Sequence, residues 1–194
     1  MRRGAVHGLG AAEWALILGA ALSLRVAVGF GWLRAMPMVS DARDYFELGA
    51  QLASGDKVGA FYWPPGESLV LAAGFAVLGP TVWAARAVTI ATSVATVALV
   101  VLVAAELAGR QAARAAGWIA ALYAPSVLLC GQTYAQHVAA LALVALAYFG
   151  LRAIRENAVW LYAAAGGALG LGCLARPSAI SVIPEASSVL RRPR

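Results

Sequence analysis

The sequence predicts an all-α, polytopic integral membrane bundle with about four full spans, joined by shorter re-entrant or hairpin segments. Composition is the first observation behind this prediction. Of the 194 residues, 62% are hydrophobic and only 12% are charged, compared with about 45–50% and about 25% in an ordinary soluble domain. These charges are too few to cover the surface of a soluble protein of this size. We therefore expect most of the surface to face lipid.

Four apolar stretches meet or approach the length of about 20 residues that a helix needs to cross a bilayer. They are Ala11–Leu33, Thr81–Ala108, Ala115–Gly131 and Gln136–Leu151. The first is expected to be a retained span rather than a signal peptide, because Arg25 interrupts it and no small-residue cleavage pattern follows. Two further stretches, Leu69–Gly79 and Trp160–Leu190, are too short or too broken to cross simply. We expect the former to dip into one leaflet and the latter to form a hairpin that enters and returns.

Charged residues set the predicted topology. Basic clusters lie at the ends of apolar runs, at Arg2/Arg3, Arg110/Arg114, Arg152/Arg155 and Arg191–Arg194, whereas five acids fall between residues 41 and 67. Cytoplasmic loops gather Lys and Arg. We therefore expect the clusters inside, residues 34–80 outside, and a multi-pass protein of the cell inner (plasma) membrane. The net charge of +6 then reflects topology, and no nucleic-acid partner is expected.

The outside loop, residues 34–80, is the most polar part of the chain. Its segment Asp41–Ser54 is predicted to be a helix that ends at Gly55, with Tyr45, Leu48 and Leu52 on one face. Such an amphipathic helix can lie on the membrane surface. The aromatic cluster Phe61-Tyr62-Trp63 suits the headgroup level, and Pro64-Pro65-Gly66 forces a kink before the next apolar stretch.

Several motifs occur in a distinctive order along the chain. Ser40–Tyr45 (SDARDY) follows the first span, Trp63–Gly66 (WPPG) and Val77–Pro80 (VLGP) come next, and Tyr123–Ser126 (YAPS) and Gly170–Pro177 (GLGCLARP) follow. This order resembles the N-terminal half of the GT-C glycosyltransferases, polytopic enzymes that take sugar from a polyprenyl-phosphate carrier. Within that superfamily, the chain is most similar to bacterial relatives of the dolichyl-phosphate-mannose protein mannosyltransferases.

The resemblance implies that Asp41 is the catalytic base, because it matches the family's acidic residue just after the first span. An acceptor hydroxyl that attacks an anomeric carbon must lose its proton, and a carboxylate can take it. From the residues alone, Asp41 is equally a helix N-cap with Asp44 three residues on, and the two roles can coexist. Asp44 is the other catalytic candidate, although acids are ordinary in a first helical turn. Tyr45 and Trp63 are candidates for binding substrate or, as interfacial aromatics, for shaping the loop.

Family members usually carry a second acidic residue in the next outside loop, but here the stretch Gln132–His137 has none. His137 falls at about the matching position and is a candidate for contacting substrate, since a neutral imidazole can bind a metal or share a proton. A histidine at a helix start is also commonly structural. The sequence therefore leaves a divalent metal open as a cofactor and assigns it no ligand.

Three arginines, Arg25, Arg86 and Arg176, lie inside apolar runs, where a charge is costly unless it is paired or hydrated. The phosphate of a lipid carrier is an anion that an arginine fork binds well. The predicted topology puts Arg86 close to the outside loop and makes it the first candidate for the phosphate, with pairing to Glu67 as the alternative. Arg176 matches a family arginine and is a further candidate for binding substrate.

Two functions follow as expectations. The first is a membrane glycosyltransferase that transfers a sugar from a polyprenyl-phosphate donor to an acceptor hydroxyl on the extracytoplasmic face. The second is a non-catalytic membrane module, such as a carrier-binding or flippase-like subunit or a degenerate relative, which the missing second carboxylate favours. We expect residues 1–194 to be a single transmembrane domain, the N-terminal half of a larger GT-C fold, and a second chain to be the partner that completes it.

Overall fold

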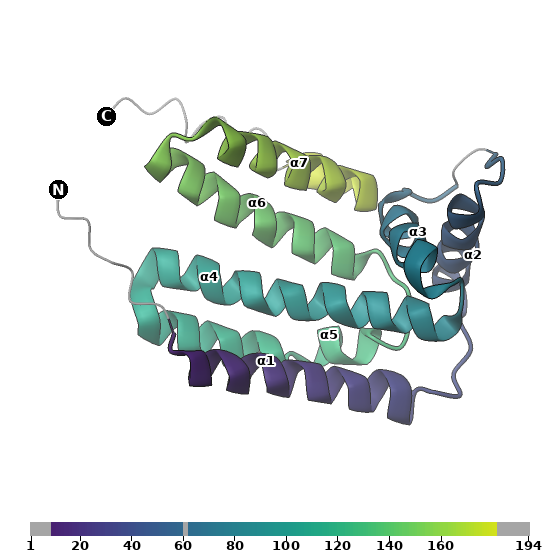
Figure 1. The fold of residues 1–194 in the computed structure, drawn as a ribbon, viewed down its shortest axis with the longest axis horizontal. Coiled ribbons are helices and arrows are strands. Elements are labelled where there is room, and N and C mark those ends of the chain that lie inside the picture. Colours follow the sequence, from purple (N-terminus) through teal and green to yellow (C-terminus); the bar gives the residue numbers. More distant parts are fainter. Residues whose placement is uncertain (1–8, 60–61, 182–194) are drawn as a thin grey trace.

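The computed structural model describes residues 9–59 and 62–181, and these are helical without any strand. The long helices run side by side, while two short helices gather at one end of the bundle (Figure 1). The long helices are α1 (Ala11–Val26, extended by a π-helical segment to Trp32), α4 (Val82–Leu122), α6 (Gln136–Glu156) and α7 (Val159–Ala175). The short ones are α2 (Asp41–Ser54), α3 (Gly66–Leu78), α5 (Ala124–Leu129) and the 3₁₀ segment η2 (Pro177–Ser181). The predicted helical membrane bundle is confirmed.

Helix α4 is a hairpin of two limbs rather than one straight rod. Gly109 has φ 80° and ψ −169°, a backbone conformation that favours glycine, and the chain reverses there (Figure 1). The limbs, residues 82–108 and 110–122, match the predicted separation of the second and third spans. The third span is itself broken, because Tyr123 leaves helical geometry at ψ 101° and Pro125 has no N–H to donate. Ala11–Trp32, Val82–Leu122 and Gln136–Glu156 are long and apolar enough to cross a membrane, and α7 is a shorter apolar helix.

Arg25 of α1 sits at this break, fully buried. Its guanidinium donates to Ser93 Oγ (2.7 Å), Ala121 O (2.9 Å) and Ala21 O (3.1 Å), with longer bonds to Ala120 O and Ser126 Oγ. The carbonyls of Ala120 and Ala121 belong to the last turn of the second α4 limb, where a helix has unpaired acceptors and a partial negative charge. Arg25 therefore caps a helix end inside the bundle, which explains its position in an apolar span.

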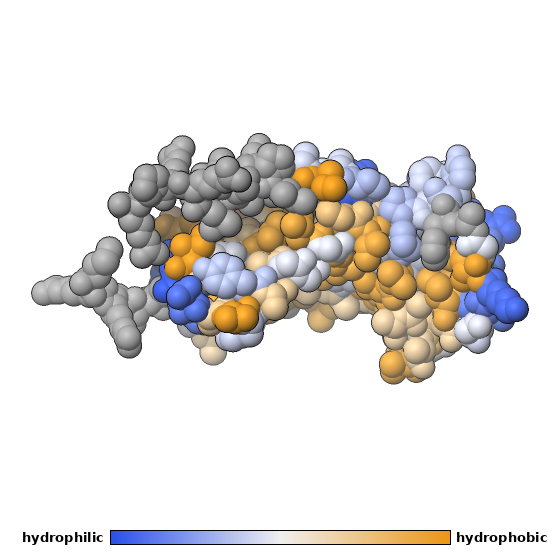
Figure 2. All heavy atoms as spheres, turned by 90° about the horizontal axis from the view of Figure 1, so that it is seen from above, coloured by the Kyte–Doolittle hydropathy of each residue, from blue (hydrophilic) through white to orange (hydrophobic). Residues whose placement is uncertain are grey.

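Ion pairs show which segments meet at one end of the bundle. Arg110 lies 2.7 Å from Glu13 and Arg114 lies 3.6 Å from it, and Arg155 pairs with Glu106. The start of α1, the bend of α4 and the end of α6 therefore share one end, which we call the Gly109 end. Exposed pairs of this kind add only about 0–1 kcal/mol each, so they report location more than stability. Hydrophilic residues gather at both ends of the visible face, with a mostly hydrophobic surface between them (Figure 2).

The opposite end holds α2 and α3, and we call it the α2–α3 end. The predicted boundaries of α2 are confirmed, including its stop at Gly55 with φ 76°. Its buried face differs from the prediction: Ala42, Tyr45 and Gly49 are buried, and a Cβ on Gly49 would lie 2.9 Å from Leu71 of α3. Helix α2 thus packs on α3, and α3 stays at this end instead of crossing the bundle, as the charge pattern predicts.

The first limb of the second predicted hairpin is α7, a single helix that runs from the Gly109 end to the α2–α3 end (Figure 1). There it meets the start of α3 so closely that a Cβ on Gly66 would lie 2.5 Å from the backbone nitrogen of Ala175. The η2 segment then lies back against α7, with Ala179 near Gly172. The rest of this predicted hairpin, like Arg2, Arg3 and Phe61, lies outside the described residues.

Candidate active site

A small cavity at the α2–α3 end brings together four of the seven predicted site residues. Its volume is about 170 Å³. Asp41 and Tyr45 reach it from α2, Trp63 from the turn before α3, and Arg176 from the end of α7. These residues are far apart in the sequence, so the cavity exists only because α2, the turn before α3, the start of α6 and the end of α7 converge at this end.

Asp44 and Trp63 form one wall of the site. The indole Nε1 of Trp63 donates to Asp44 Oδ2 at 2.9 Å, and the Trp63 ring lies 6.4 Å from the ring of Tyr45. Both aromatic residues also line an adjacent cavity of about 330 Å³ that includes Asp44. The structure thus uses Asp44 to hold Trp63, while its catalytic role stays a prediction.

Asp41 is the first residue of α2 and not its cap. Ser40 is the N-cap residue, with φ 51°, and its Oγ donates to Asp41 Oδ1 at 2.9 Å. The N-cap interpretation of Asp41 is therefore wrong by one position. A carboxylate in the first turn is still stabilised by the helix dipole, and Asp41 is only partly buried. This position leaves the Asp41 carboxylate open to the cavity.

Arg86 holds the segment that leads to Asp41. Its guanidinium is buried and donates to the carbonyls of Gly131 (3.1 Å), Arg34 (3.0 Å) and Met36 (2.7 Å). The alternative of a pair with Glu67 is wrong, because these three carbonyls are the partners. They account for a buried charge without any phosphate, so the role that sequence reasoning assigned to Arg86 stays a prediction and the structure gives it a positioning role.

The loop before α6 also holds the segment that leads to Asp41. Gln132 Nε2 donates to Pro37 O at 3.0 Å, its Oε1 accepts from the Val39 backbone at 3.4 Å, and the Thr133 hydroxyl donates to Ala42 O. The acid expected in this loop from the resemblance is absent. Its polar side chains instead fix the backbone on both sides of Asp41.

Arg176 has the freest guanidinium of the three predicted arginines. Unlike Arg25 and Arg86, it is exposed, and no hydrogen bond or ion pair joins its guanidinium to another residue in the described ranges 9–59 and 62–181. It lines the Asp41 cavity and a neighbouring groove of about 360 Å³. The pKa of Tyr45 is raised, mainly because the hydroxyl is buried and also because Asp41 and Glu67 are near it. The positive charge of Arg176 acts in the opposite direction and lowers this pKa. Positive and negative side chains therefore flank the Tyr45 hydroxyl.

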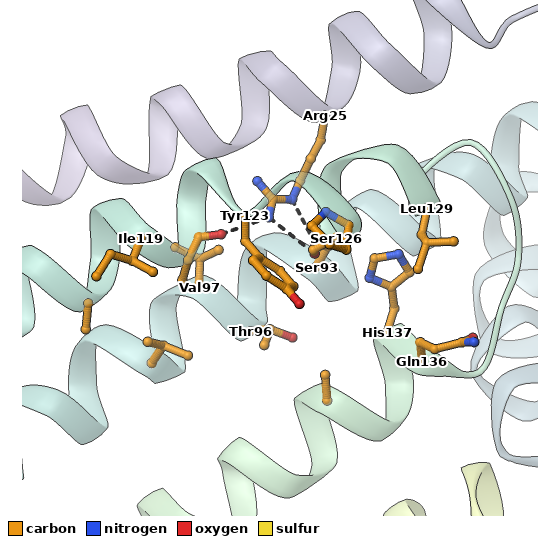
Figure 3. A pocket seen from close by; sticks show the side chains of 15 residues that line it. Arg25, Ser93, Thr96, Val97, Ile119, Tyr123, Ser126, Leu129, Gln136 and His137 are labelled. Atoms are coloured by element: carbon orange, nitrogen blue, oxygen red, sulfur yellow. Dashed lines mark hydrogen bonds between the residues drawn. The ribbon is translucent and has the colours of Figure 1, made fainter.

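His137 is not part of this cavity. It is the second residue of α6, is buried, and lines a larger cavity between α6 and the two limbs of α4 (Figure 3). Within residues 9–59 and 62–181, no group of three or more His, Cys, Asp or Glu side chains is placed to hold a metal ion. The predicted contact of His137 with substrate stays a prediction.

The sequence model of the dolichyl-phosphate-mannose-protein mannosyltransferase family matches residues 63–190, well over half of the chain. The chain belongs to this family. It is therefore a member of the GT-C membrane glycosyltransferases. No curated protein and no solved structure matches it.

The match to the mannosyltransferase family divides the site residues. Trp63, Arg86, His137 and Arg176 lie inside residues 63–190, whereas Asp41 and Tyr45 precede them. The cavity itself joins both groups, since Trp63, Arg176, Asp41 and Tyr45 all line it. Geometry thus supports the placement of Asp41 at the site independently of the family match.

Sequence reasoning considered Glu67 only as a partner for Arg86 and missed its own situation. Glu67 lies in the first turn of α3, is 1% exposed, and its Oε2 has no hydrogen-bond partner among the described residues. Burial raises the pKa of Glu67 to about 8. The sequence does carry a signal for this position. Glu67 directly follows the Pro-Pro-Gly turn and stands at the start of an apolar helix.

The raised pKa of Glu67 predicts how stability depends on pH. Folding raises this pKa from 4.5 to about 8, so between these values the folded chain keeps a proton that the unfolded chain has lost. The contribution of Glu67 to the free energy of unfolding is therefore largest below pH 4.5 and falls as the pH rises through about 8. The Glu67→Gln variant stays neutral, so we expect its stability to exceed that of the wild type increasingly from about pH 5 to about pH 9, by about 1–3 kcal/mol.

Thermal unfolding in detergent at a series of pH values measures this gain. Glu47→Gln is the matched control, because Glu47 is exposed and pairs with Arg43 on the surface of α2. A stability difference between Glu67→Gln and the wild type that is constant with pH would contradict the prediction.

Proposed function

We propose that this glycosyltransferase moves a sugar from a polyprenyl-phosphate donor to an acceptor hydroxyl in the cavity at the α2–α3 end. One observation carries the proposal: an accessible carboxylate, Asp41, and an arginine without a partner in the described part of the chain, Arg176, line the same small cavity. These are the two charges that such a transfer needs, on opposite sides of the reacting carbon. The aromatic rings of Tyr45 and Trp63 line the same cavity and can pack against a sugar ring.

In this reaction, the acceptor oxygen attacks the anomeric carbon and forms the new C–O bond. The Asp41 carboxylate takes the hydroxyl proton, a contribution of about 10²–10⁴-fold in rate. The bond between the anomeric carbon and the phosphate oxygen breaks, and the polyprenyl phosphate leaves with the electron pair. Arg176 stabilises the charge that develops on this leaving group, as an arginine fork does for phosphates.

The sidedness of the reaction follows from the basic residues. Four arginines cluster near the Gly109 end: Arg110, Arg114, Arg152 and Arg155. The rule that cytoplasmic segments gather Lys and Arg supports a cytoplasmic Gly109 end. The α2–α3 end then faces outward, and we propose that the chain is a multi-pass protein of the plasma membrane that acts on its extracytoplasmic face.

The Arg176→Gln variant tests the phosphate contact. Charge-assisted hydrogen bonds contribute about 1.5–3 kcal/mol, so we expect the affinity for a long-chain polyprenyl phosphate to fall about 10- to 100-fold. Equilibrium binding to the chain in phosphatidylcholine nanodiscs measures it. Arg43→Gln is the matched control, since Arg43 is exposed at the same end and pairs with Glu47 on the surface of α2. Equal affinity of a folded Arg176→Gln variant and the wild type would remove Arg176 from the phosphate site.

Carrier binding without transfer is the second candidate function. The observation in its favour is the loop before α6, whose polar side chains hold backbone and include no acid. Polyprenyl-phosphate binding that depends on Arg176, together with no sugar transfer even when a completing second chain is supplied, would support this function instead.

A further inference from the structure

A second, larger cavity, which His137 lines, has no role in the proposed reaction. It measures about 600 Å³ and lies between the two limbs of α4 and the start of α6, next to Arg25 of α1 (Figure 3). This volume is within the range of about 300–1,000 Å³ that is typical of ligand sites. The wall is predominantly apolar, and the polar side chains are unevenly distributed along it.

The two ends of this cavity differ in chemistry. Gln136 and His137 at the start of α6, with Ser126 and Arg25, lie toward the α2–α3 end. Val100 and Ala116 lie nearer to the Gly109 bend along both limbs of α4. A polar head at the membrane surface and an apolar body that runs into the bilayer match an amphipathic lipid with its chain inside the bundle.

The polar end of the cavity holds a buried polar atom without a partner. His137 is 4% exposed, and its Nε2 has no hydrogen-bond partner within the described residues. Leaving a buried polar atom unpaired is costly, so this nitrogen favours a ligand whose polar headgroup can form a hydrogen bond with it. Arg25, in contrast, already has hydroxyl and carbonyl acceptors and needs no ligand.

Gln136 connects this cavity to the site. It lines the large cavity, the Asp41 cavity and the groove of Arg176, and it is exposed. A headgroup at Gln136 would therefore lie next to the groove of Arg176, with the Asp41 cavity directly adjoining. No other residue of the described chain lines all three of these spaces.

We propose that the cavity between the α4 limbs and α6 holds the isoprenoid chain of the donor, with the phosphate at Gln136 and the sugar in the Asp41 cavity. This inference rests on the proposed polyprenyl-phosphate donor and adds where its chain lies. Gln136 is then a positioning residue, because it places the phosphate and takes no part in proton transfer.

A variant that fills the apolar end tests the inference. Ala116→Phe places a ring in the cavity far from Asp41, whereas Ala115→Phe, the matched control, adds the same ring at an exposed position of the same limb that does not line the cavity. In phosphatidylcholine nanodiscs, we expect Ala116→Phe to weaken binding of a long-chain polyprenyl phosphate at least about tenfold. Binding of geranyl phosphate, whose short chain stays near Gln136, should change far less. Equal loss for both ligands, or no loss for the long one, would overturn the inference.

A labelling experiment on the wild-type chain does not depend on the folding of any variant. A polyprenyl phosphate with a diazirine in its isoprenoid chain should label peptides from both limbs of α4 and from α6. Labelling confined to α3 and α7 would overturn the inference, and so would full protection by excess phosphatidylglycerol, because the cavity would then be a general phospholipid site. Labelling without any sugar transfer, even when a completing second chain is supplied, would defeat the proposed function and leave the site of the isoprenoid chain intact.

Discussion

Replacing Asp41 by asparagine is expected to reduce sugar transfer by about 10²–10⁴-fold, because the variant loses the carboxylate that accepts the acceptor's proton. Asparagine keeps the shape of the side chain and an oxygen that can accept the Ser40 hydroxyl, as Asp41 Oδ1 does at 2.9 Å. Loss of a negative charge from the first turn of α2 costs only about 0.3–1 kcal/mol. The variant should therefore fold and still bind the donor.

Transfer from a polyprenyl-phosphate sugar in proteoliposomes measures this effect, with donor binding measured on the same preparation. Glu47→Gln, on the exposed side of the same helix, should transfer like the wild type. Near wild-type transfer by Asp41→Asn would show that Asp41 is only a helix-start residue, and it would shift the catalytic role to Asp44 or favour carrier binding without transfer.

The Gly66→Ala substitution is expected to give the largest structural effect. A Cβ at this position would lie 2.5 Å from the nitrogen and 2.7 Å from the Cα of Ala175. Both atoms belong to backbone, which cannot rotate away as a flexible side chain can. The start of α3 and the end of α7 must then move apart. Overpacking of this kind lowers the free energy of unfolding by about 1–3 kcal/mol. Because Arg176 follows Ala175, this separation also moves the guanidinium away from Asp41.

We therefore expect Gly66→Ala to lower the thermal unfolding temperature in detergent and to weaken polyprenyl-phosphate binding. Gly167→Ala is the matched control. Gly167 lies within α7, and a Cβ there would meet nothing within 4 Å, so this variant should be as stable as the wild type or more stable by up to about 1 kcal/mol. If Gly66→Ala and Gly167→Ala behave alike, α3 and α7 are not in close contact.

Local patterns predicted much of the fold. Apolar length and basic clusters predicted the spans, the bend near Arg110 and the short α3, because lipid contact and charge placement act on each segment separately. The periodicity of α2 and Gly55 predicted the boundaries of this helix. They did not predict its buried face, because that face depends on where Leu71 of α3 packs against it.

The site was harder to predict, because its residues are defined by distant partners. Nothing around Arg86 indicates that the carbonyls of Arg34 and Gly131 will surround it. Likewise, the sequence puts Gln136 and His137 side by side, but in a helix adjacent residues point in different directions. His137 thus lines the large cavity and not the Asp41 cavity, whereas Gln136 lines both.

The capping of a broken helix by Arg25 has a consequence for how the chain is made. Its bond to the Ala121 carbonyl joins residues 96 positions apart, and ribosomes add about 5–20 residues per second. For about 5–20 s of synthesis, α1 therefore carries a guanidinium in the membrane before the carbonyls of the second α4 limb exist, and an arginine at the centre of an isolated span disfavours insertion by about 2.5–3.5 kcal/mol. Stable insertion of the first helix is thus coupled to the arrival of the second limb of α4, and the insertion machinery must hold α1 until then.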